Sequence, residues 1–342
     1  MNNNGLKKKL KVLLFINENS QFSKYHFFKL LVQPDIELIG IVSNRKTSSK
    51  TERTKFFSIF NFFKRLNDRM SFESNVILLR LQKALINSHD IRIMRPKKLN
   101  QKLASQISLM SPDLIISAGY VKKIPTVILK IPKIGSFNFH PSLLPAYAGG
   151  NPWFWVIAKG EKYTGVTIHA MNSVYDAGDI VIQKRIKIVD GATEQYLIYA
   201  TTLASINLIP NFIQLCKENK LVMRSQTLSK RSYFRKVTDL DKKINWNDNA
   251  ENIKNLIQAC LSGFGAWSKI KDERLWINKA YIGNDIGRKY KKGMIINISR
   301  EGIEVATNDK TIFITAGIIN SIRINNLDIV KKLKLRKGDI FN

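Results

Sequence analysis

Short apolar runs alternate with segments of helical spacing along the first 140 residues of the chain. Apolar runs bounded by turn residues predict buried strands, whereas apolar positions that recur every three or four residues predict amphipathic helices. Strands are expected at residues 11–17, 36–43, 91–94, 112–120 and 134–140, and helices at 22–32, 76–87 and 100–110. Because strand, helix and strand follow one another, the pattern predicts an α/β domain with a doubly wound, mostly parallel sheet.

In the second half of the chain, helices and strands first continue to alternate, and short β-like runs then replace this pattern. A helix at 153–158, strands at 165–171 and 184–189, and a long helix at 194–216 complete a first domain that we place at 1–222. A polar, basic linker is predicted at 223–240. Beyond it, a helix at 250–260 and a turn at 263–267 precede short β-like runs that alternate with glycine or charged turns. This spacing predicts a small C-terminal β-barrel domain at 241–342.

Three polar side chains interrupt the apolar pattern near the middle of the chain. Asn138 and His140 lie two apart on one predicted strand, so they point to one face, while Phe137 and Phe139 point to the other. Asp176 lies in the turn-like sequence Tyr-Asp-Ala-Gly-Asp that follows a later strand. If the fold brings them together, an amide, an imidazole and a carboxylate form one site.

Those three groups can catalyse acyl transfer. The amide can donate to a carbonyl oxygen as it gains negative charge, and the imidazole can move a proton near neutral pH. The carboxylate can orient the imidazole or accept a proton from an attacking amine. Each residue also has an ordinary structural interpretation, as a hydrogen-bonded group at a strand end or as a turn former. Asn138, His140 and Asp176 are therefore candidate catalytic residues, and no metal cluster is predicted.

Composition narrows the class of protein. Among 342 residues, 56 are Lys or Arg and 26 are Asp or Glu, which gives a net charge of +30. Such a charge either indicates a polyanionic partner, such as a nucleic acid or an anionic membrane surface, or reflects a composition rich in Lys, Asn and Ile. No apolar run is long enough to span a bilayer, and the first apolar run is better explained as a strand than as a signal peptide. We therefore expect a cytoplasmic protein without a transmembrane segment.

The stretch that begins at Asn138 resembles the folate-dependent formyltransferase family. It reads Asn-Phe-His-Pro-Ser-Leu-Leu-Pro, and Thr-Gly-Val-Thr-Ile-His and Asp-Ala-Gly-Asp follow further along. The family includes glycinamide ribonucleotide, methionyl-tRNA and amino-sugar N-formyltransferases. The resemblance implies that Asn138, His140 and Asp176 are the catalytic residues, that 10-formyltetrahydrofolate is the co-substrate and that no metal is used. It also implies an OB-like fold for the C-terminal barrel.

The expected folate site combines residues from two sources. The resemblance places the cofactor against the segment after the catalytic strand, namely Ser142, Leu143, Leu144 and Pro145. Ligands of open α/β sheets sit beyond the carboxyl ends of the strands, which adds Met94, Gly119 and Tyr120 as candidates. An ordinary turn at the end of a strand is the alternative interpretation for these last three residues.

The acceptor of the formyl group is open between two substrates. Methionyl-tRNA is the first choice, because the C-terminal domain and the charge fit a tRNA enzyme. A nucleotide-linked amino sugar is the second, because residues 146–153 lack the arginines of the tRNA enzymes and Trp153 or Trp155 could stack on a sugar or base. A nucleic-acid-binding protein that lost catalysis is a rival of another class. The basic segments 44–75 and 329–337 could both contact phosphates. Alternatively, segment 44–75 is an insertion packed on the sheet, and segment 329–337 is a solvated, tail-like end.

Overall fold

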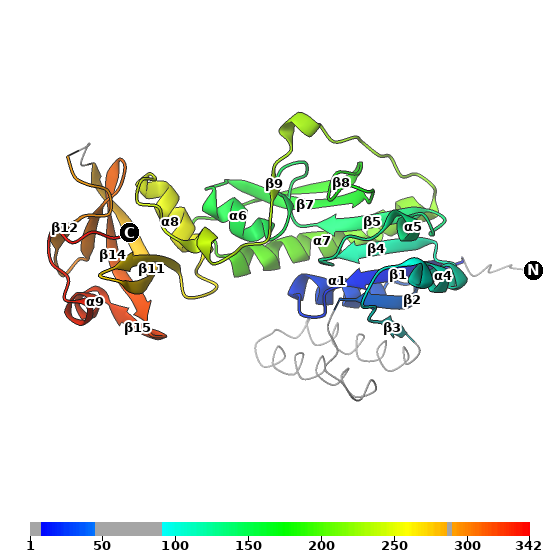
Figure 1. The fold of residues 1–342 in the computed structure, drawn as a ribbon. Helices are drawn as coiled ribbons and strands as arrows, with labels where there is room; N and C mark the ends of the chain where they lie inside the picture. Colours follow the sequence, from blue (N-terminus) through cyan, green and yellow to red (C-terminus); the bar gives the residue numbers. More distant parts are fainter. Residues whose placement is uncertain (1–7, 45–90, 286–288) are drawn as a thin grey trace, which may run out of the picture. The chain divides into compact units, whose positions relative to one another are not determined.

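The computed structural model describes residues 8–44, 91–285 and 289–342. Seven strands form one sheet in the order β3-β2-β1-β4-β5-β7-β8 (Figure 1). The five strands from β1 to β5 pair in parallel, and β7 pairs antiparallel with β5, so the predicted mostly parallel sheet is confirmed. The strands are β1 Leu10–Ile16, β2 Ile36–Ser43, β3 Arg92–Met94, β4 Leu114–Ala118, β5 Gly135–His140, β7 Tyr163–Ala170 and β8 Ile180–Lys187.

Most helices of this part begin and end within two residues of their predicted bounds. They are α1 Gln21–Leu31, α4 Gln101–Met110, α6 Pro152–Ala158 and α7 Glu194–Lys217, with a single-turn helix α5 Thr126–Leu129 that the apolar pattern did not predict. Side-chain caps define two of the starts, because Ser20 accepts from the backbone N–H of Ser23, and Asn100 from that of Leu103. The strand expected at 184–189 begins four residues earlier, since the apolar Ile180 already pairs with Arg224.

The chain forms two compact units, and neither is one continuous stretch of sequence. The first contains Met1–His140, Val166–Lys184 and Thr202–Leu228, and the second contains Pro141–Gly165, Arg185–Thr201 and Ser229–Asn342. The elements β7, β8 and α7 each contribute residues to both units. The predicted boundaries at 222 and 240 divide the chain sequentially and stay a prediction. The predicted helix at 76–87 and nearly all of the basic segment 44–75 lie outside the described residues.

The core of the first unit contains a histidine that no solvent reaches. His26 on α1 is fully buried, and its ring lies 5.2 Å from that of Phe139. Its Nδ1 lies 2.7 Å from the carbonyl oxygen of Phe22, and its Nε2 lies 2.6 Å from Oγ of Ser205. A carbonyl only accepts, so Nδ1 donates to Phe22 and Nε2 accepts from the Ser205 hydroxyl. Burial outweighs the bond to Phe22 and lowers the pKa of His26 to about 4.

This buried ring predicts an acid-sensitive fold. The unfolded chain binds a proton at His26 below pH 6.5, whereas the folded chain does so only near pH 4. The stabilising contribution of neutral His26 is therefore complete above pH 6.5 and is lost as the pH falls toward 4, by about 3 kcal/mol. Urea unfolding of wild type and of His26→Gln at several pH values tests this. The difference in unfolding free energy between the two proteins should shrink by that amount, and a constant difference would contradict the prediction.

The long helix α7 is the one helix, among the described residues, whose length and apolar composition would allow it to cross a membrane. The core helix of a globular domain passes the same test, and α7 has the contacts of such a helix. Phe212 is fully buried and lies with its ring 5.1 Å from Phe137 and 5.7 Å from Phe139 of β5. The apolar character of this part of α7 is accounted for by its packing on the sheet.

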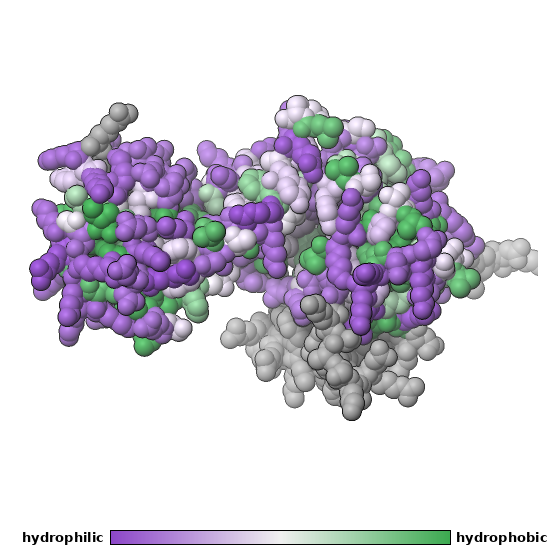
Figure 2. Space-filling model, viewed as in Figure 1, coloured by the Kyte–Doolittle hydropathy of each residue, from purple (hydrophilic) through white to green (hydrophobic). Residues whose placement is uncertain are grey.

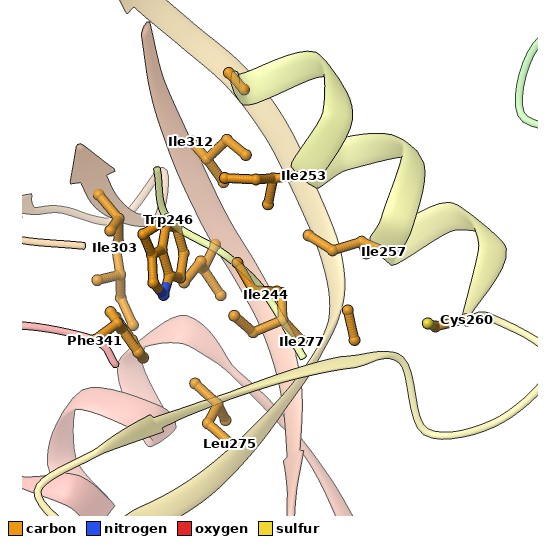
Figure 3. Packing of buried hydrophobic residues seen from close by; sticks show 14 of the residues in the cluster. Ile244, Trp246, Ile253, Ile257, Cys260, Leu275, Ile277, Ile303, Ile312 and Phe341 are labelled. Atoms are coloured by element: carbon orange, nitrogen blue, oxygen red, sulfur yellow. The ribbon is translucent and has the colours of Figure 1, made fainter. Parts of the chain in front are cut away.

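The C-terminal part of the second unit is an antiparallel sheet around an apolar core. The strand order is β10-β11-β14-β13-β12, and β15 pairs with β14. Its elements are α8 Ala250–Ala259, β10 Ala266–Ile270, β11 Glu273–Asp285, β12 Ile295–Ile298, β13 Ile303–Ala306, β14 Lys310–Ile319, β15 Ile322–Asn325 and α9 Asn326–Leu333. Figure 3 shows Trp246 surrounded by Ile303, Phe341 and other apolar side chains, with Ile253 and Ile257 of α8 beside the same core.

The last residues of the chain join the two outer strands of this sheet. On the β12 side, Ile295 donates to Asp339 and accepts from Gly338, and Phe341 donates to Gly293. On the β10 side, Lys269 and Asn342 exchange two backbone hydrogen bonds of 3.1 and 2.8 Å. Because both edges are paired through this segment, the sheet closes into the predicted small barrel.

The structure corrects one interpretation of the basic segment 329–337. A solvated, tail-like end is wrong, because residues 326–333 form α9 and its Ile329 and Leu333 are buried. The cationic Lys331 and Lys332 lie on its exposed side, as expected for an amphipathic helix. Over this domain, the face shown in Figure 2 is largely hydrophilic with separate hydrophobic spots.

Candidate active site

Strand β5 separates its polar and apolar side chains as the alternation predicted. Phe137 and Phe139 are buried against Phe212 of α7. Asn138 and His140 therefore face the other side of the sheet. The neighbouring strand β7 runs antiparallel, and its register places His169 directly opposite Asn138.

Asp176 reaches this face from the loop between β7 and β8. Its carboxylate Oδ1 lies 3.3 Å from Nδ2 of Asn138 and 3.6 Å from Nδ1 of His140. Asp176 adopts a left-handed backbone conformation, with φ of 52°. Gly178 allows the loop to lie close to β7, because a Cβ there would be 1.9 Å from the carbonyl oxygen of Ala170. The fold thus brings together the three predicted catalytic side chains.

A fourth polar side chain, His169, belongs to the same cluster and was not predicted. Its Nε2 lies 3.2 Å from Nδ2 of Asn138 and 3.5 Å from Oδ1 of Asp176. Its Nδ1 lies 2.8 Å from the carbonyl oxygen of Ala170, which can only accept, so this nitrogen carries a proton. In the neutral ring Nε2 then accepts from Asn138. The sequence signal was the histidine that ends Thr-Gly-Val-Thr-Ile-His, an otherwise apolar strand.

The arrangement fixes the direction of the Asn138 amide. One N–H points to Nε2 of His169 and the other to the carboxylate of Asp176. Water hardly reaches the cluster, since the side chains of His140, His169 and Asp176 are 6, 2 and 10% exposed. Hydrogen bonds and charges act more strongly in such surroundings than in water. The cluster can therefore stabilise a developing oxyanion and hold a proton released by a nucleophile.

A pocket opens beside this cluster in the first unit. Asn138, His169 and Asp176 form part of its wall, and Ser117 and Tyr120 lie at the carboxyl end of β4. The rest of the lining consists of Lys122, Lys123, Ile124, Leu129, Met171, Asn172, Val174 and Tyr175. Apart from Tyr120, sequence reasoning did not assign these non-catalytic residues to a site, because no local pattern marks them. Among the described residues, no group of three His, Cys, Asp or Glu side chains could hold a metal ion.

The predicted folate residues occupy different places. Tyr120 lines the pocket, and the adjacent Gly119 takes φ of 72° where a Cβ would be 2.7 Å from Oγ of Ser23. The side chain of Met94 is buried in the core, so only its backbone lies at the strand end. The remaining four, Ser142, Leu143, Leu144 and Pro145, belong to the second unit. The assignment of these residues to folate stays a prediction.

The two tryptophans considered for acceptor stacking pack within the second unit. The indole N–H of Trp153 donates to Oγ1 of Thr201 at 2.8 Å. Trp155 stacks on Phe234 with ring centroids 4.9 Å apart, and its N–H donates to the carbonyl oxygen of Arg235. Both rings also pack against the apolar core of that unit. Their indole groups are therefore held by contacts inside the protein.

Comparison with known proteins agrees with this geometry. Residues 10–213 match the family model for formyl transferase, and residues 236–326 match its C-terminal domain. The N-formyltransferase of Helicobacter canadensis, solved with folinic acid and dTDP-3-aminofucose, has a similar fold with a TM-score of 0.59 at 17% identity, over 90% of this chain and 98% of that one. HypX of Aquifex aeolicus, solved with tetrahydrofolic acid, matches 98% of this chain and 51% of its own with a TM-score of 0.56 at 16% identity.

The sequence relatives include proteins of two kinds. The bifunctional polymyxin resistance protein ArnA of Wigglesworthia glossinidia brevipalpis is 35% identical over 72% of this chain, which spans only 38% of that longer protein. The methionyl-tRNA formyltransferase of Carboxydothermus hydrogenoformans is 32% identical over 67% of this chain and 74% of its own length. With both domains matched and Asn138, His140 and Asp176 in one cluster, the chain belongs to the formyl transferase family.

Proposed function

We propose that the protein transfers a formyl group from 10-formyltetrahydrofolate to a primary amine. The proposal rests mainly on one observation, namely that His169 and Asp176 hold the Asn138 amide in one orientation at the wall of the pocket. With His169 holding one N–H, the amide stays oriented while the N–H that faces Asp176 can turn to a carbonyl oxygen that gains negative charge. The proposal uses no serine or cysteine nucleophile, because an amine aligned beside a reactive formyl group can attack it directly.

The pocket lining fits a flat heterocycle with a polar edge. Ile124, Leu129, Met171 and Val174 provide apolar contacts. The hydroxyl of Tyr120 is buried and has no hydrogen-bond partner among the described residues, although its side chain lines the pocket. Burial raises the pKa of Tyr120 to about 12, so the hydroxyl stays protonated and can donate or accept. These residues would hold the pterin part of the folate, whose bound form supplies the formyl group.

Each residue of the cluster has a distinct task in this proposal. When substrate binds, Asn138 exchanges its Nδ2–H bond to Asp176 for one to the formyl oxygen, as negative charge develops there. Asp176 and His140, with Oδ1 and Nδ1 3.6 Å apart, take up the proton that the amine loses. His169 orients the Asn138 amide, because in the neutral ring Nδ1 donates to the carbonyl oxygen of Ala170 and Nε2 accepts from Asn138. The low exposure of these side chains keeps bulk water away from the reacting atoms.

For the acceptor we propose methionyl-tRNA, in a cytoplasmic enzyme. The support is the net charge of +30, the barrel that follows the catalytic part, and the similarity to methionyl-tRNA formyltransferases. A nucleotide-linked amino sugar is the second candidate, favoured by the absence of arginine from residues 146–153 and by the structural similarity to a sugar N-formyltransferase. Trp153 and Trp155 pack inside the second unit, so they do not add support for an amino-sugar acceptor.

The experiment is a formylation assay with both acceptors across a salt series. If tRNA is the substrate, kcat/KM for methionyl-tRNA should fall steeply with salt, because phosphate contacts release counterions. Replacing Lys331, Lys332 and Lys334, which are exposed at the end of α9, by Glu should raise KM for tRNA about tenfold and flatten that salt dependence.

The same three lysines changed to Arg provide the matched control, because the charge is kept. Single-turnover rates at saturating tRNA should stay near wild type in both triple variants. Rapid formylation of an amino sugar without formylation of methionyl-tRNA would select the second acceptor. If neither amine is formylated in the presence of 10-formyltetrahydrofolate, the proposed function is wrong.

A further inference from the structure

We propose that Gln226 is a positioning residue that holds the Asp176 loop in the geometry needed for formyl transfer. The inference rests on the proposed function, but Gln226 lies fifty residues beyond Asp176, in a segment whose sequence carries no motif. The sequence placed this residue in a linker. The structure instead places its side chain against the backbone of the catalytic loop.

The segment that carries Gln226 is attached to the sheet next to the loop. Ile180, the first residue of β8, and Arg224 exchange two backbone hydrogen bonds of 2.8 and 2.9 Å. This antiparallel bridge fixes the chain two residues before Gln226. Because β8 begins directly after the loop, the same bridge also fixes the point at which the loop returns to the sheet.

The Gln226 amide then clamps the loop on both sides of Ala177. Its Nε2 lies 3.0 Å from the carbonyl oxygen of Asp176 and 2.7 Å from that of Gly178. An amide nitrogen carries two hydrogens, and each meets one carbonyl. This also fixes the orientation of the amide, because the reverse orientation would place Oε1 against two carbonyl oxygens. The oxygen Oε1 is buried and has no hydrogen-bond partner among the described residues.

The loop needs such a clamp because its backbone is not in a relaxed conformation. Asp176 has φ of 52°, a region that residues with a Cβ rarely occupy and that surrounding contacts must maintain. The same residue must present Oδ1 to Asn138 and His140 at 3.3 and 3.6 Å. Without Gln226, the loop loses two of the hydrogen bonds that favour this conformation. The carboxylate is then free to leave the position from which it accepts a proton.

Double-mutant kinetics test this role. Gln226→Ala is expected to lower the single-turnover rate of formyl transfer on the order of tenfold or more, because small misplacement of catalytic groups is costly. In an Asp176→Asn background, where the carboxylate is already absent, the same change should alter the rate less than twofold. A role in overall stability would reduce both rates equally.

Gln258 provides a matched control. Its Nε2 also joins two backbone carbonyls, those of Gly191 and Ala192, at 2.7 and 3.1 Å. Gln258→Ala should lower the melting temperature by an amount similar to Gln226→Ala and leave the single-turnover rate within twofold of wild type.

Gln226→Glu adds a pH readout. An ionised carboxylate repels both loop carbonyls, whereas a protonated one offers a single donor, so the rate relative to wild type should rise as the pH falls from 8 to 6. The positioning role is wrong if wild type is active and Gln226→Ala keeps the full single-turnover rate. It is also wrong if Gln226→Ala lowers that rate equally in the wild-type and Asp176→Asn backgrounds. A wild type that formylates no amine would instead refute the proposed function itself.

Discussion

Asn138→Ala is expected to lower the rate of formyl transfer by roughly two orders of magnitude or more. The Asn138 amide, held by His169 and Asp176 at the pocket wall, is the proposed donor to the formyl oxygen, and loss of one oxyanion donor typically has an effect of this size. The measurement is the single-turnover rate with saturating co-substrate and acceptor. Asn207→Ala, at an exposed position of α7, is the matched control and should retain the wild-type rate.

His140→Ala and Asp176→Ala should cause losses of comparable size, because these two side chains handle the proton of the amine. Since the residues act as a unit, the double variant should be little worse than the poorer single variant. A variant that keeps near wild-type turnover with an intact fold would show that its side chain is not part of the catalytic machinery. Thermal unfolding of each variant establishes whether the fold is intact.

Phe341→Ala should destabilise the C-terminal domain by about 3–5 kcal/mol, the usual cost of truncating a buried aromatic side chain. Phe341 is 2% exposed, and its ring lies 5.3 Å from that of Trp246, beside which Figure 3 shows it. Its segment also joins the two outer strands of the barrel. Urea unfolding followed by tryptophan fluorescence measures the change.

Leu327→Ala is the control for this prediction, because Leu327 on α9 is 51% exposed and loses little buried surface. Its unfolding midpoint should shift by a small fraction of the shift seen for Phe341→Ala. Equal shifts would show that the end of the chain contributes no more to the barrel than an exposed residue does. The unfolding midpoint of Phe341→Leu should lie between those of Phe341→Ala and Leu327→Ala, since leucine keeps most of the apolar contact.

Several features of the fold could be read from local pattern alone. The alternation along β5 predicted that Asn138 and His140 share a face while Phe137 and Phe139 enter the core, and the contacts with Phe212 agree. The period of two along a strand is a property of the backbone, so neighbouring residues suffice to specify it. Helix bounds such as those of α1 and α4 were predictable for a similar reason, because caps and periodicity are local.

Contacts between distant segments were not predictable in this way. His169 joined the site because the antiparallel register of β5 and β7 places it opposite Asn138. Gln226 reached the Asp176 loop through the bridge between Ile180 and Arg224. Neither pairing can be predicted from the residues next to it in sequence, because the register of two strands depends on how the chain between them folds back.

The sequence by itself determined the alternation of elements, the chemical types of the catalytic cluster and the resemblance that joins them. Those properties arise from backbone geometry over a few residues and from a motif that stays recognisable in one dimension. Only the tertiary structure decided that the basic segment near the end of the chain forms α9 and that residues 338–342 close the barrel. A charged amphipathic segment is compatible with solvent or with a core, and the outcome depends on whether the rest of the fold offers an apolar surface. Here Ile329 and Leu333 of α9 join the apolar core of the second unit.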